Sequence, residues 1–218
     1  PYGNAGSAEV GKYKAIILSK LIALKEGGSI WIDQRFLNYA AGLRMVKDKK
    51  WANLFGFPQR EAEAALEQRH CDLGLAIQEV TEEIVLRMAQ EAKRLTEAKN
   101  LCLAGGVALN CVANGKLQSA GIFENIFIVP AAGDAGGSLG AALAAEHISF
   151  GQERSLVLPD GLEGAYLGPE YSAKEIVLMA RKYKAVATQF AEYPSLAEKA
   201  ASLLADGNVV GWFQGRME

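Results

Sequence analysis

Two stretches decide how this 218-residue chain folds: residues 101–110, which read LCLAGGVALN, and residues 126–137, which read IFIVPAAGDAGG. In each, a short, continuous apolar run passes into glycines and then into a helix-like sequence. Apolar runs of this length are typical of strands buried on both faces of a parallel sheet. The two stretches therefore predict two strand–turn–helix units, with strands at 101–104 and 126–129.

The residues around these strands extend the pattern in both directions. Over residues 72–95, apolar side chains recur at three- and four-residue steps, which predicts a long amphipathic helix with Glu82 on its polar side. Further helices are expected at 107–120 and 138–145. The order helix, strand, helix, strand, helix predicts a parallel α/β core over residues 72–146.

The flanking regions carry weaker patterns. Toward the N-terminus we predict a helix over the apolar residues 16–24, a strand at 29–32 and a solvated loop at 45–63. After a linker at 150–165, two capping-box patterns, Ser172 with Glu175 and Ser195 with Glu198, predict helices that end near Tyr183 and Asp206, the second closed by Gly207. Strands are expected at 185–190 and 208–213, with Trp212 and Phe213 in a core.

The glycines of the two turns point to chemistry at one edge of the sheet. In a parallel sheet joined by a right-handed crossover, both turns lie at the carboxyl edge, where ligands bind. Each turn leads into a helix N-terminus, whose free N–H groups favour an anion, and glycine lets the backbone approach a phosphate closely. Asp134 among these glycines makes sense beside a phosphate only if a cation lies between them, which favours a metal.

A purely structural interpretation stays open at this point. Glycines in strand–helix turns also serve tight packing, and Asp134 could be a helix N-cap. Neither turn fits GxxxxGK[ST] or GxGxxG. His70 and His147 form no HxxxH or HExxH pair, and Cys102 and Cys111 fit core positions better than ligand positions.

Charge and composition exclude several classes of protein. The chain has 23 basic and 25 acidic residues and a net charge of −2, so it carries no basic footprint for nucleic acid and no polybasic membrane patch. No apolar run approaches the ~18 residues of a membrane helix. Three cysteines, an odd and sparse number, fit a reducing compartment. Together with the lack of a basic-then-apolar signal pattern, this predicts a cytoplasmic protein.

The motifs closely resemble those of the O-carbamoyltransferases of the nodulation-protein-U and antibiotic-tailoring type. Residues 103–115 and 130–142 carry most of the resemblance. Pro1-Tyr2-Gly3 resembles the end of the family's Gly-Leu-Ala-Pro-Tyr-Gly motif. Residues 166–171 and 211–218 resemble the opening of its C-terminal domain.

The resemblance implies a domain organisation. Residues 1–149 would belong to the second half of an actin-like ATPase domain of ribonuclease-H-like fold, akin to the universal tRNA threonylcarbamoyl transferase. Residues 150–165 would be a linker, and residues 166–218 the truncated start of a YrdC-like α/β domain. The chain is accordingly expected to be a central fragment of a protein two to three times its length, inactive alone and a candidate for homodimer formation.

The resemblance also implies an activity and the residues that serve it. The family moves a carbamoyl group from carbamoyl phosphate, with ATP and through carbamoyl adenylate, to a hydroxyl of a small molecule such as a sugar, an antibiotic or an oligosaccharide. An HxxxH pair and one aspartate hold a divalent, iron-type metal; Asp134 matches that aspartate. The positions that match the nucleotide-binding turns are Gly105, Gly106, Val107, Asn110, Gly136 and Gly137, and Arg216 is a candidate for carbamoyl adenylate binding.

Three departures from the family pattern limit what this chain is expected to do, and two other functions stay open. It contains no HxxxH pair, so two of the three expected metal ligands lie outside it. The first half of the actin-like domain and the arginines expected after Glu218 to hold carbamoyl adenylate are also missing, and no catalytic residue or acceptor is identified. One alternative is another actin-like ATPase, such as a sugar kinase, which also uses a Gly-Gly turn for ATP. The other is a non-catalytic partner-binding module that kept the fold and lost the chemistry.

Overall fold

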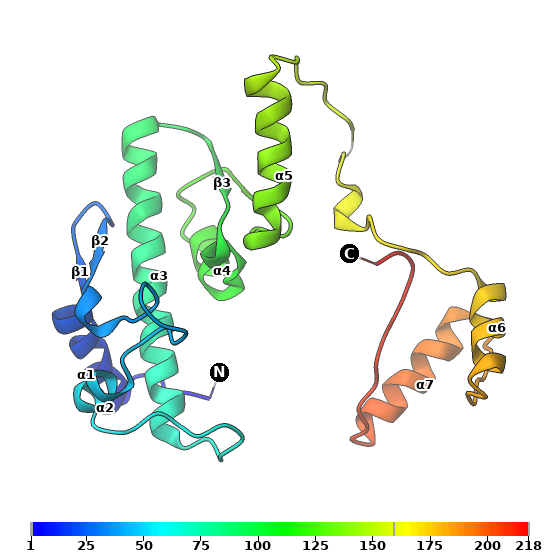
Figure 1. Ribbon diagram of the computed structural model, residues 1–218, viewed down its shortest axis with the longest axis horizontal. Helices are drawn as coiled ribbons and strands as arrows, with labels where there is room; N and C mark the ends of the chain where they lie inside the picture. The colour runs from blue at the N-terminus through cyan, green and yellow to red at the C-terminus, as the bar shows by residue number, and fades with distance from the viewer. Residues whose placement is uncertain (1, 159, 218) are drawn as a thin grey trace. The chain divides into compact units, whose positions relative to one another are not determined.

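The computed structural model describes residues 2–158 and 160–217. The chain divides into two compact units, residues 1–144 and residues 145–218, and each is described by itself (Figure 1). Pro1, Pro159 and Glu218, which belong to the N-terminal motif, the linker and the C-terminal motif, lie outside the described residues. Within the described ranges, no helix is both long enough and apolar enough to cross a bilayer.

The N-terminal unit combines helices with two pairs of short strands. Its elements are α1 (Ala8–Ile16), a π-helical turn (Ile17–Leu21), β1 (Ile22–Leu24), β2 (Ile30–Ile32), a 3-10 turn (Gln34–Phe36), α2 (Asp48–Phe55), α3 (Gln68–Thr96), β3 (Asn100–Leu103), a 3-10 turn (Gly106–Leu109), α4 (Cys111–Ser119), β4 (Asn125–Ile128) and α5 (Asp134–Ala144). From α3 to α5 this is the predicted order of helix, strand, helix, strand and helix. The helix predicted at 107–120 is divided into the 3-10 turn and α4.

The strands pair as two separate two-stranded sheets. β3 and β4 run parallel, as predicted, with Leu101 opposite Ile126 and Leu103 opposite Ile128. β1 and β2 run antiparallel, which confirms the strand predicted near residue 30. The helix predicted over residues 16–24 is wrong at its end, because pairing with β2 holds the last three residues in extended backbone.

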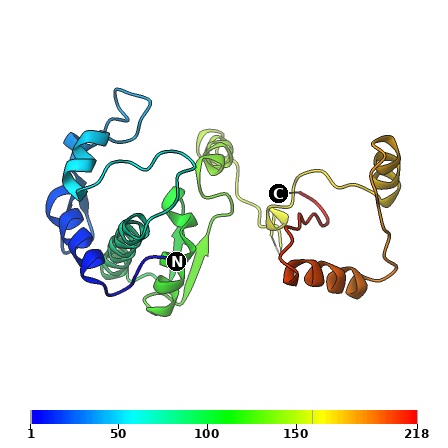
Figure 2. The ribbon, with the colours of Figure 1, turned by 90° about the horizontal axis from the view of Figure 1, so that it is seen from below.

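α3 carries core residues for both sides of this unit. Figures 1 and 2 show it between the group formed by α1, α2 and the β1–β2 hairpin (residues 22–32) and the group formed by β3, β4 and α4. On the first side Ala76 and Val80 of α3 pack with α1 and α2. On the second side Ala89 packs with Leu117 and Phe123. One amphipathic helix thus joins two apolar clusters.

α2 replaces the loop that was predicted at 45–63, so that prediction is wrong for eight residues. Its aromatic side chains explain the helix. The ring centroids of Trp51 and Phe55 are 5.4 Å apart, and those of Phe55 and Tyr13 of α1 are 5.9 Å apart. Packing of this apolar face against α1 therefore stabilises a helix that is only eight residues long and would be marginal in isolation.

The prediction that β3 and β4 are buried on both faces is wrong. Leu101 and Leu103 pack toward α3 and α4, whereas Cys102 is exposed and Phe127 of β4 is 56% exposed. Alternate side chains of a strand point to opposite faces, and the helices cover only one of them. The prediction that Cys102 and Cys111 occupy core positions is also wrong, since both residues are exposed.

The C-terminal unit is helical. Its elements are a π-helical turn (Ala145–Ser149), a 3-10 turn (Glu163–Ala165), α6 (Ala173–Lys182) and α7 (Tyr193–Ala205). The Ser172–Glu175 capping box of α6 is confirmed. The Ser195 box is wrong, because α7 begins two residues earlier with a proline in its first turn, a position that proline favours.

The two strands predicted in this unit are absent from its described residues. Residues 185–190 and 208–213 take no strand conformation there. A strand needs a hydrogen-bonded neighbour, and the secondary structure described for this unit consists of helices and turns. The core prediction for Trp212 and Phe213 is wrong for the same reason: without a sheet to pack in, they are 50% and 57% exposed.

The close contact between the hairpin and α3 yields a stability prediction. Gly28 has φ +75°, and a methyl group built on it would lie 2.4 Å from the backbone nitrogen of Met88. Gly28→Ala should therefore lower the free energy of unfolding by about 2–4 kcal/mol through overpacking and backbone strain. Urea denaturation measures it, with Gly11→Ala, which has open space and no positive φ, as the control. Equal midpoints for both variants would contradict this packing.

Candidate active site

The two glycine turns meet at one edge of the parallel sheet. The N–H of Gly105 donates to the carbonyl oxygen of Ala132, with an N···O distance of 2.8 Å. A methyl group built on Gly133 would lie 3.5 Å from Cδ1 of Leu109. Because β3 and β4 run parallel, both turns follow the carboxyl ends of their strands. Residues predicted from separate motifs are thereby brought together, Asp134 among them.

The first turn presents bare backbone. Gly105 has φ +93°, and a methyl group built on Gly105 or on Gly106 would meet no other atom within 4 Å. Gly106 and Val107 begin the 3-10 turn, so their N–H groups have no carbonyl partner within it. Val107 is 61% exposed. This turn can offer N–H groups to an anion without moving any side chain.

α5 begins at Asp134, four residues before the predicted start, so Gly136 and Gly137, both predicted to bind nucleotide, lie in the first turn of this helix. Their surroundings differ. A methyl group on Gly136 would lie 2.6 Å from the carbonyl oxygen of Ala131, which itself has φ +51°. The Gly136 N–H donates to the Gly133 carbonyl at 3.1 Å. Gly136 is thus required by its own turn. Gly137, by contrast, has open space around its Cα.

Asp134 is the first residue of α5 and is exposed. A carboxylate in this place interacts favourably with the helix dipole and is accessible to a cation. In the part of the chain that the structure describes, no three His, Cys, Asp or Glu side chains gather as a metal site. Asp134 therefore fits a metal as one oxygen ligand, and the other ligands would have to come from elsewhere.

Asn110 belongs to a hydrogen-bonded network between α3 and α4. Its Oδ1 accepts from the Ala113 N–H at 3.1 Å, which caps α4, and from Gln78 Nε2 at 3.0 Å. Its Nδ2 donates to Gln78 Oε1 at 2.9 Å. Gln78 Nε2 also donates to Glu82 Oε1 at 3.0 Å, and Glu82 pairs with Lys116 of α4.

The sequence interpretation missed Gln78 and Lys116 and misplaced Glu82. Glu82 was assigned to the polar side of α3, but it is buried, with 5% of its surface exposed. The available signal was spacing: Gln78 and Glu82 are four residues apart and so share one face of the helix. A glutamine and a glutamate on the face that receives α4 could have indicated a buried polar pair.

The Glu82 carboxyl remains ionised in this setting. Burial is the largest single effect and acts to raise its pKa. The hydrogen bonds from Lys116 and Gln78 and the charges of Lys116 and Lys14 together outweigh burial and hold the pKa below its ordinary value of 4.5. A carboxyl whose pKa is lowered by folding stabilises the fold at neutral pH. That stabilisation is lost as the pH falls through the folded-state pKa.

Lys116→Met should expose this contribution. It leaves the buried Glu82 carboxylate without its cation and should lower the free energy of unfolding by about 1–2 kcal/mol at neutral pH, since Lys116 itself is half exposed. The difference from wild type should shrink as the pH falls below 4.5. Arg87→Met, which breaks the more exposed Glu83–Arg87 pair, is the control and should cost less than about 0.5 kcal/mol. A difference that grows on acidification would contradict the assignment.

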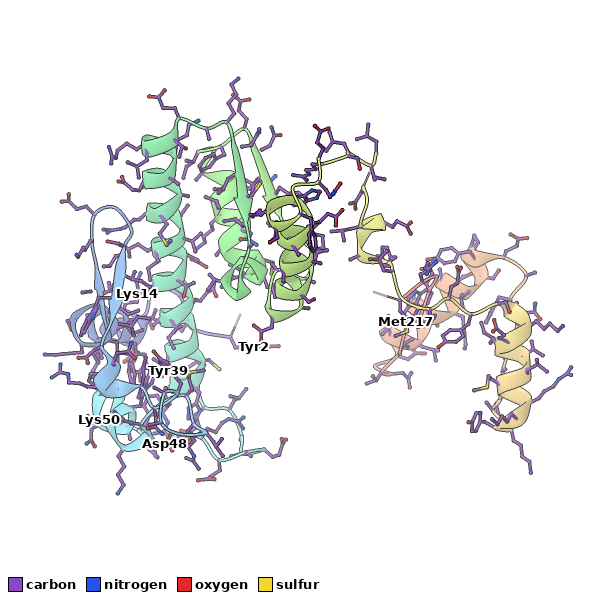
Figure 3. All side chains as sticks on the ribbon, turned by 45° about the horizontal axis from the view of Figure 1, so that its top comes forward. Tyr2, Lys14, Tyr39, Asp48, Lys50 and Met217 are labelled. Atoms are coloured by element: carbon purple, nitrogen blue, oxygen red, sulfur yellow. The ribbon has the colours of Figure 1, made fainter. Side chains whose placement is uncertain are left out.

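In the C-terminal unit, the motifs at residues 166–171 and 211–218 contact each other. Gly168 N–H donates to the Met217 carbonyl at 2.8 Å, and Met217 N–H donates to the Pro169 carbonyl at 3.1 Å. Met217 is labelled in Figure 3. The rings of Tyr171 and Phe213 lie 6.1 Å apart. Arg216, the candidate for carbamoyl adenylate binding, is exposed and donates from Nε to the Gly168 carbonyl at 3.1 Å. The backbone hydrogen bonds of Met217 hold the segment that carries Arg216.

Known proteins match most or all of the chain. Residues 2–143 match the sequence model of the carbamoyltransferase N-terminus. The chain is 47% identical over 220 residues to the uncharacterized protein sll1178 of Synechocystis sp.. This match covers 100% of the chain and 34% of the relative. It is 40% identical over 151 residues to the nodulation protein NolNO of Sinorhizobium fredii, 69% of this chain and 22% of the relative.

A relative with a named activity is more distant. The 3'-hydroxymethylcephem-O-carbamoyltransferase of Streptomyces clavuligerus is 29% identical over 163 residues, which is 71% of this chain and 27% of that protein. The chain thus spans about a third or less of the length of these relatives.

Proposed function

Because the chain belongs to the carbamoyltransferase family, we propose that it takes part in ATP-dependent O-carbamoyl transfer. The donor is carbamoyl phosphate and the acceptor a hydroxyl of a small molecule, with carbamoyl adenylate as the activated form, in the cytoplasm. Residues 1–149 are then part of an actin-like domain and residues 166–218 the start of a YrdC-like one. Family membership sets aside the sugar-kinase alternative.

The meeting of the two glycine turns is the observation that carries this proposal. The Gly105–Ala132 hydrogen bond ties them at the carboxyl edge of β3 and β4, where α/β proteins bind their ligands. The N–H groups of Gly106 and Val107 would bind phosphate oxygens of the nucleotide, and the open space at Gly137 would admit the same group from the second turn. Arg216 would add a cation for the adenylate in the C-terminal unit.

Asp134 would supply one carboxylate oxygen to a divalent, iron-type metal at this edge, with the remaining ligands outside this chain. When bound, such a metal supplies Lewis-acid polarisation of a carbonyl or hydroxyl oxygen. In the transfer itself, the acceptor oxygen bonds to the carbamoyl carbon, the bond from that carbon to the AMP phosphate oxygen breaks, and AMP and the hydroxyl proton leave. The glycine turn holds the phosphate in place while this occurs.

Gly106→Ala tests the nucleotide site with little structural effect. The added methyl group enters open space, so the fold should be unaffected, but it should block close approach of a phosphate and weaken ATP binding by about tenfold or more. Gly115→Ala, also in open space but on α4 away from the turn, is the control and should bind ATP like wild type. Titration calorimetry on a form with the length of the relatives provides the measurement. Unchanged affinity in Gly106→Ala would contradict the proposed site.

A further inference from the structure

We propose that Gln78 is a positioning residue of the nucleotide site: it fixes the Asn110 amide and, through it, the turn from Gly105 to Asn110. This inference rests on the proposed function. Gln78 lies on α3, more than twenty residues before the first glycine turn, and it does not belong to the motif. Its side chain nevertheless makes a two-way hydrogen bond with the amide that ends this turn, at 2.9 and 3.0 Å.

The orientation of both amides is determined from the two ends of the network. At one end the Ala113 N–H needs an acceptor, so Oδ1 of Asn110 must face α4. At the other end the ionised Glu82 can only accept, so Nε2 of Gln78 must face Glu82. Both requirements lead to the same arrangement between Gln78 and Asn110. The side-chain Oδ1 of Asn110 then accepts two hydrogen bonds and one Nδ2 hydrogen is donated. The second Nδ2 hydrogen remains to be offered to a ligand.

Asn110 transmits this constraint to the backbone of the turn. Its N–H donates to the Val107 carbonyl at 3.0 Å, and its carbonyl accepts from the Asn114 N–H at 3.0 Å. Asn114 in turn donates from Nδ2 to the Ala108 carbonyl at 2.7 Å. The 3-10 turn is therefore held from its end by two asparagines, and only Asn110 is anchored to another helix. A turn held in its binding conformation loses less entropy when the ligand arrives.

A purely structural role would stabilise α3 against α4 without affecting ligand binding, and a two-step substitution separates these roles. Gln78→Glu keeps the shape, but it cannot donate to Asn110 or Glu82 and places a second carboxylate beside Glu82. Adding Glu82→Gln removes that repulsion and should recover stability. It does not restore a donor to Asn110 Oδ1, so nucleotide affinity should stay low. Gln78→Met, neutral and of similar size, covers the case in which Gln78→Glu does not fold.

The experiment is an NMR titration of the ¹⁵N-labelled 218-residue chain with Mg·ATP into the millimolar range. Gln90→Glu, the same change at an exposed position of α3, is the control. We expect the Asn110 side-chain amide signals to move in the Gln78 variants before any ligand is added. We also expect the ATP affinity, measured from the signals of the Gly105–Asn110 turn, to be about tenfold weaker in Gln78→Glu, Gln78→Met and the double variant. Gln90→Glu should bind ATP like wild type.

Two results would overturn the inference, and a third concerns only the proposed function. Unmoved Asn110 amide signals in the Gln78 variants would show that Gln78 does not fix this side chain. ATP affinity that recovers together with stability in the double variant would leave Gln78 a structural role alone. If ATP moves no signal of the turn in the wild-type chain, the proposed nucleotide site fails, while the amide signals still decide whether Gln78 orients Asn110.

Discussion

Asp134→Ala, in a form of the protein with the length of its relatives, is expected to abolish carbamoyl transfer and to lower the bound metal. The carboxylate is exposed at the start of α5, beside the point where the two glycine turns meet. In the proposed metal site, removing this carboxylate takes away one protein ligand, and a single preorganised electrostatic group is typically worth on the order of 10²- to 10³-fold in rate. Elemental analysis and a carbamoyl-transfer assay measure the two effects.

A structural role for Asp134 predicts a different outcome. As a first-turn acid it would only interact with the helix dipole, a small contribution to stability. Glu9→Ala removes a first-turn acid from α1 of the same unit and is the matched control. If Asp134→Ala retains metal and turnover as Glu9→Ala does, then Asp134 is a helix-terminus residue and not a metal ligand.

The 218-residue chain by itself is expected to fold but to be catalytically silent. Two apolar clusters joined by α3 supply a core for the N-terminal unit. Of the metal ligands expected from the family, the 218-residue chain contains only Asp134, and one carboxylate does not define a transition-metal site. The bare backbone of Gly105 and Gly106 is open to water, so its interactions with a nucleotide are screened. ATP should bind in the millimolar range, about −4 kcal/mol.

Calorimetric titration with ATP and a divalent metal, together with an assay of AMP release from ATP and carbamoyl phosphate, checks this expectation. Heat-unfolded chain is the blank for the assay. Circular dichroism with a cooperative thermal transition should verify that the chain is folded. Micromolar ATP affinity or metal-dependent AMP release would mean that this segment contains a more complete site than the residues described here provide.

The same chain should associate with itself. An apolar cavity of about 500 Å³ lies beside the first turn, lined by residues of α3, β3 and the hairpin, and Trp31 and Val107 are 58% and 61% exposed. Exposed apolar surface of this kind is seldom left uncovered in water. Light scattering after size-exclusion chromatography should give a mass above 23.3 kDa that depends on concentration. A monomer at all concentrations would contradict this prediction.

Local sequence was sufficient for the central part of the fold. The three- to four-residue period of α3, the short apolar runs of β3 and β4 and the glycines after them are each read within a few residues, so their order and parallel direction could be predicted. The same holds for the Ser172–Glu175 capping box, whose hydrogen bonds span three residues. It also holds for placing Gly105 and Asp134 at one sheet edge, since the crossover rule needs only the order of elements.

Tertiary structure alone decided the features that depend on distant partners. β1 became a strand because β2 pairs with it, α2 formed against Tyr13, and residues 208–213 formed no strand in a unit built from helices and turns. Glu82 is buried because Lys116, thirty-four residues away, reaches it, and Asn110 is oriented by Gln78 across thirty-two. A periodic pattern reports which face of an element is apolar. It does not report which element arrives at that face, and for a buried polar group the arriving partner decides whether it is tolerated, because only a partner can replace the hydrogen bonds of water.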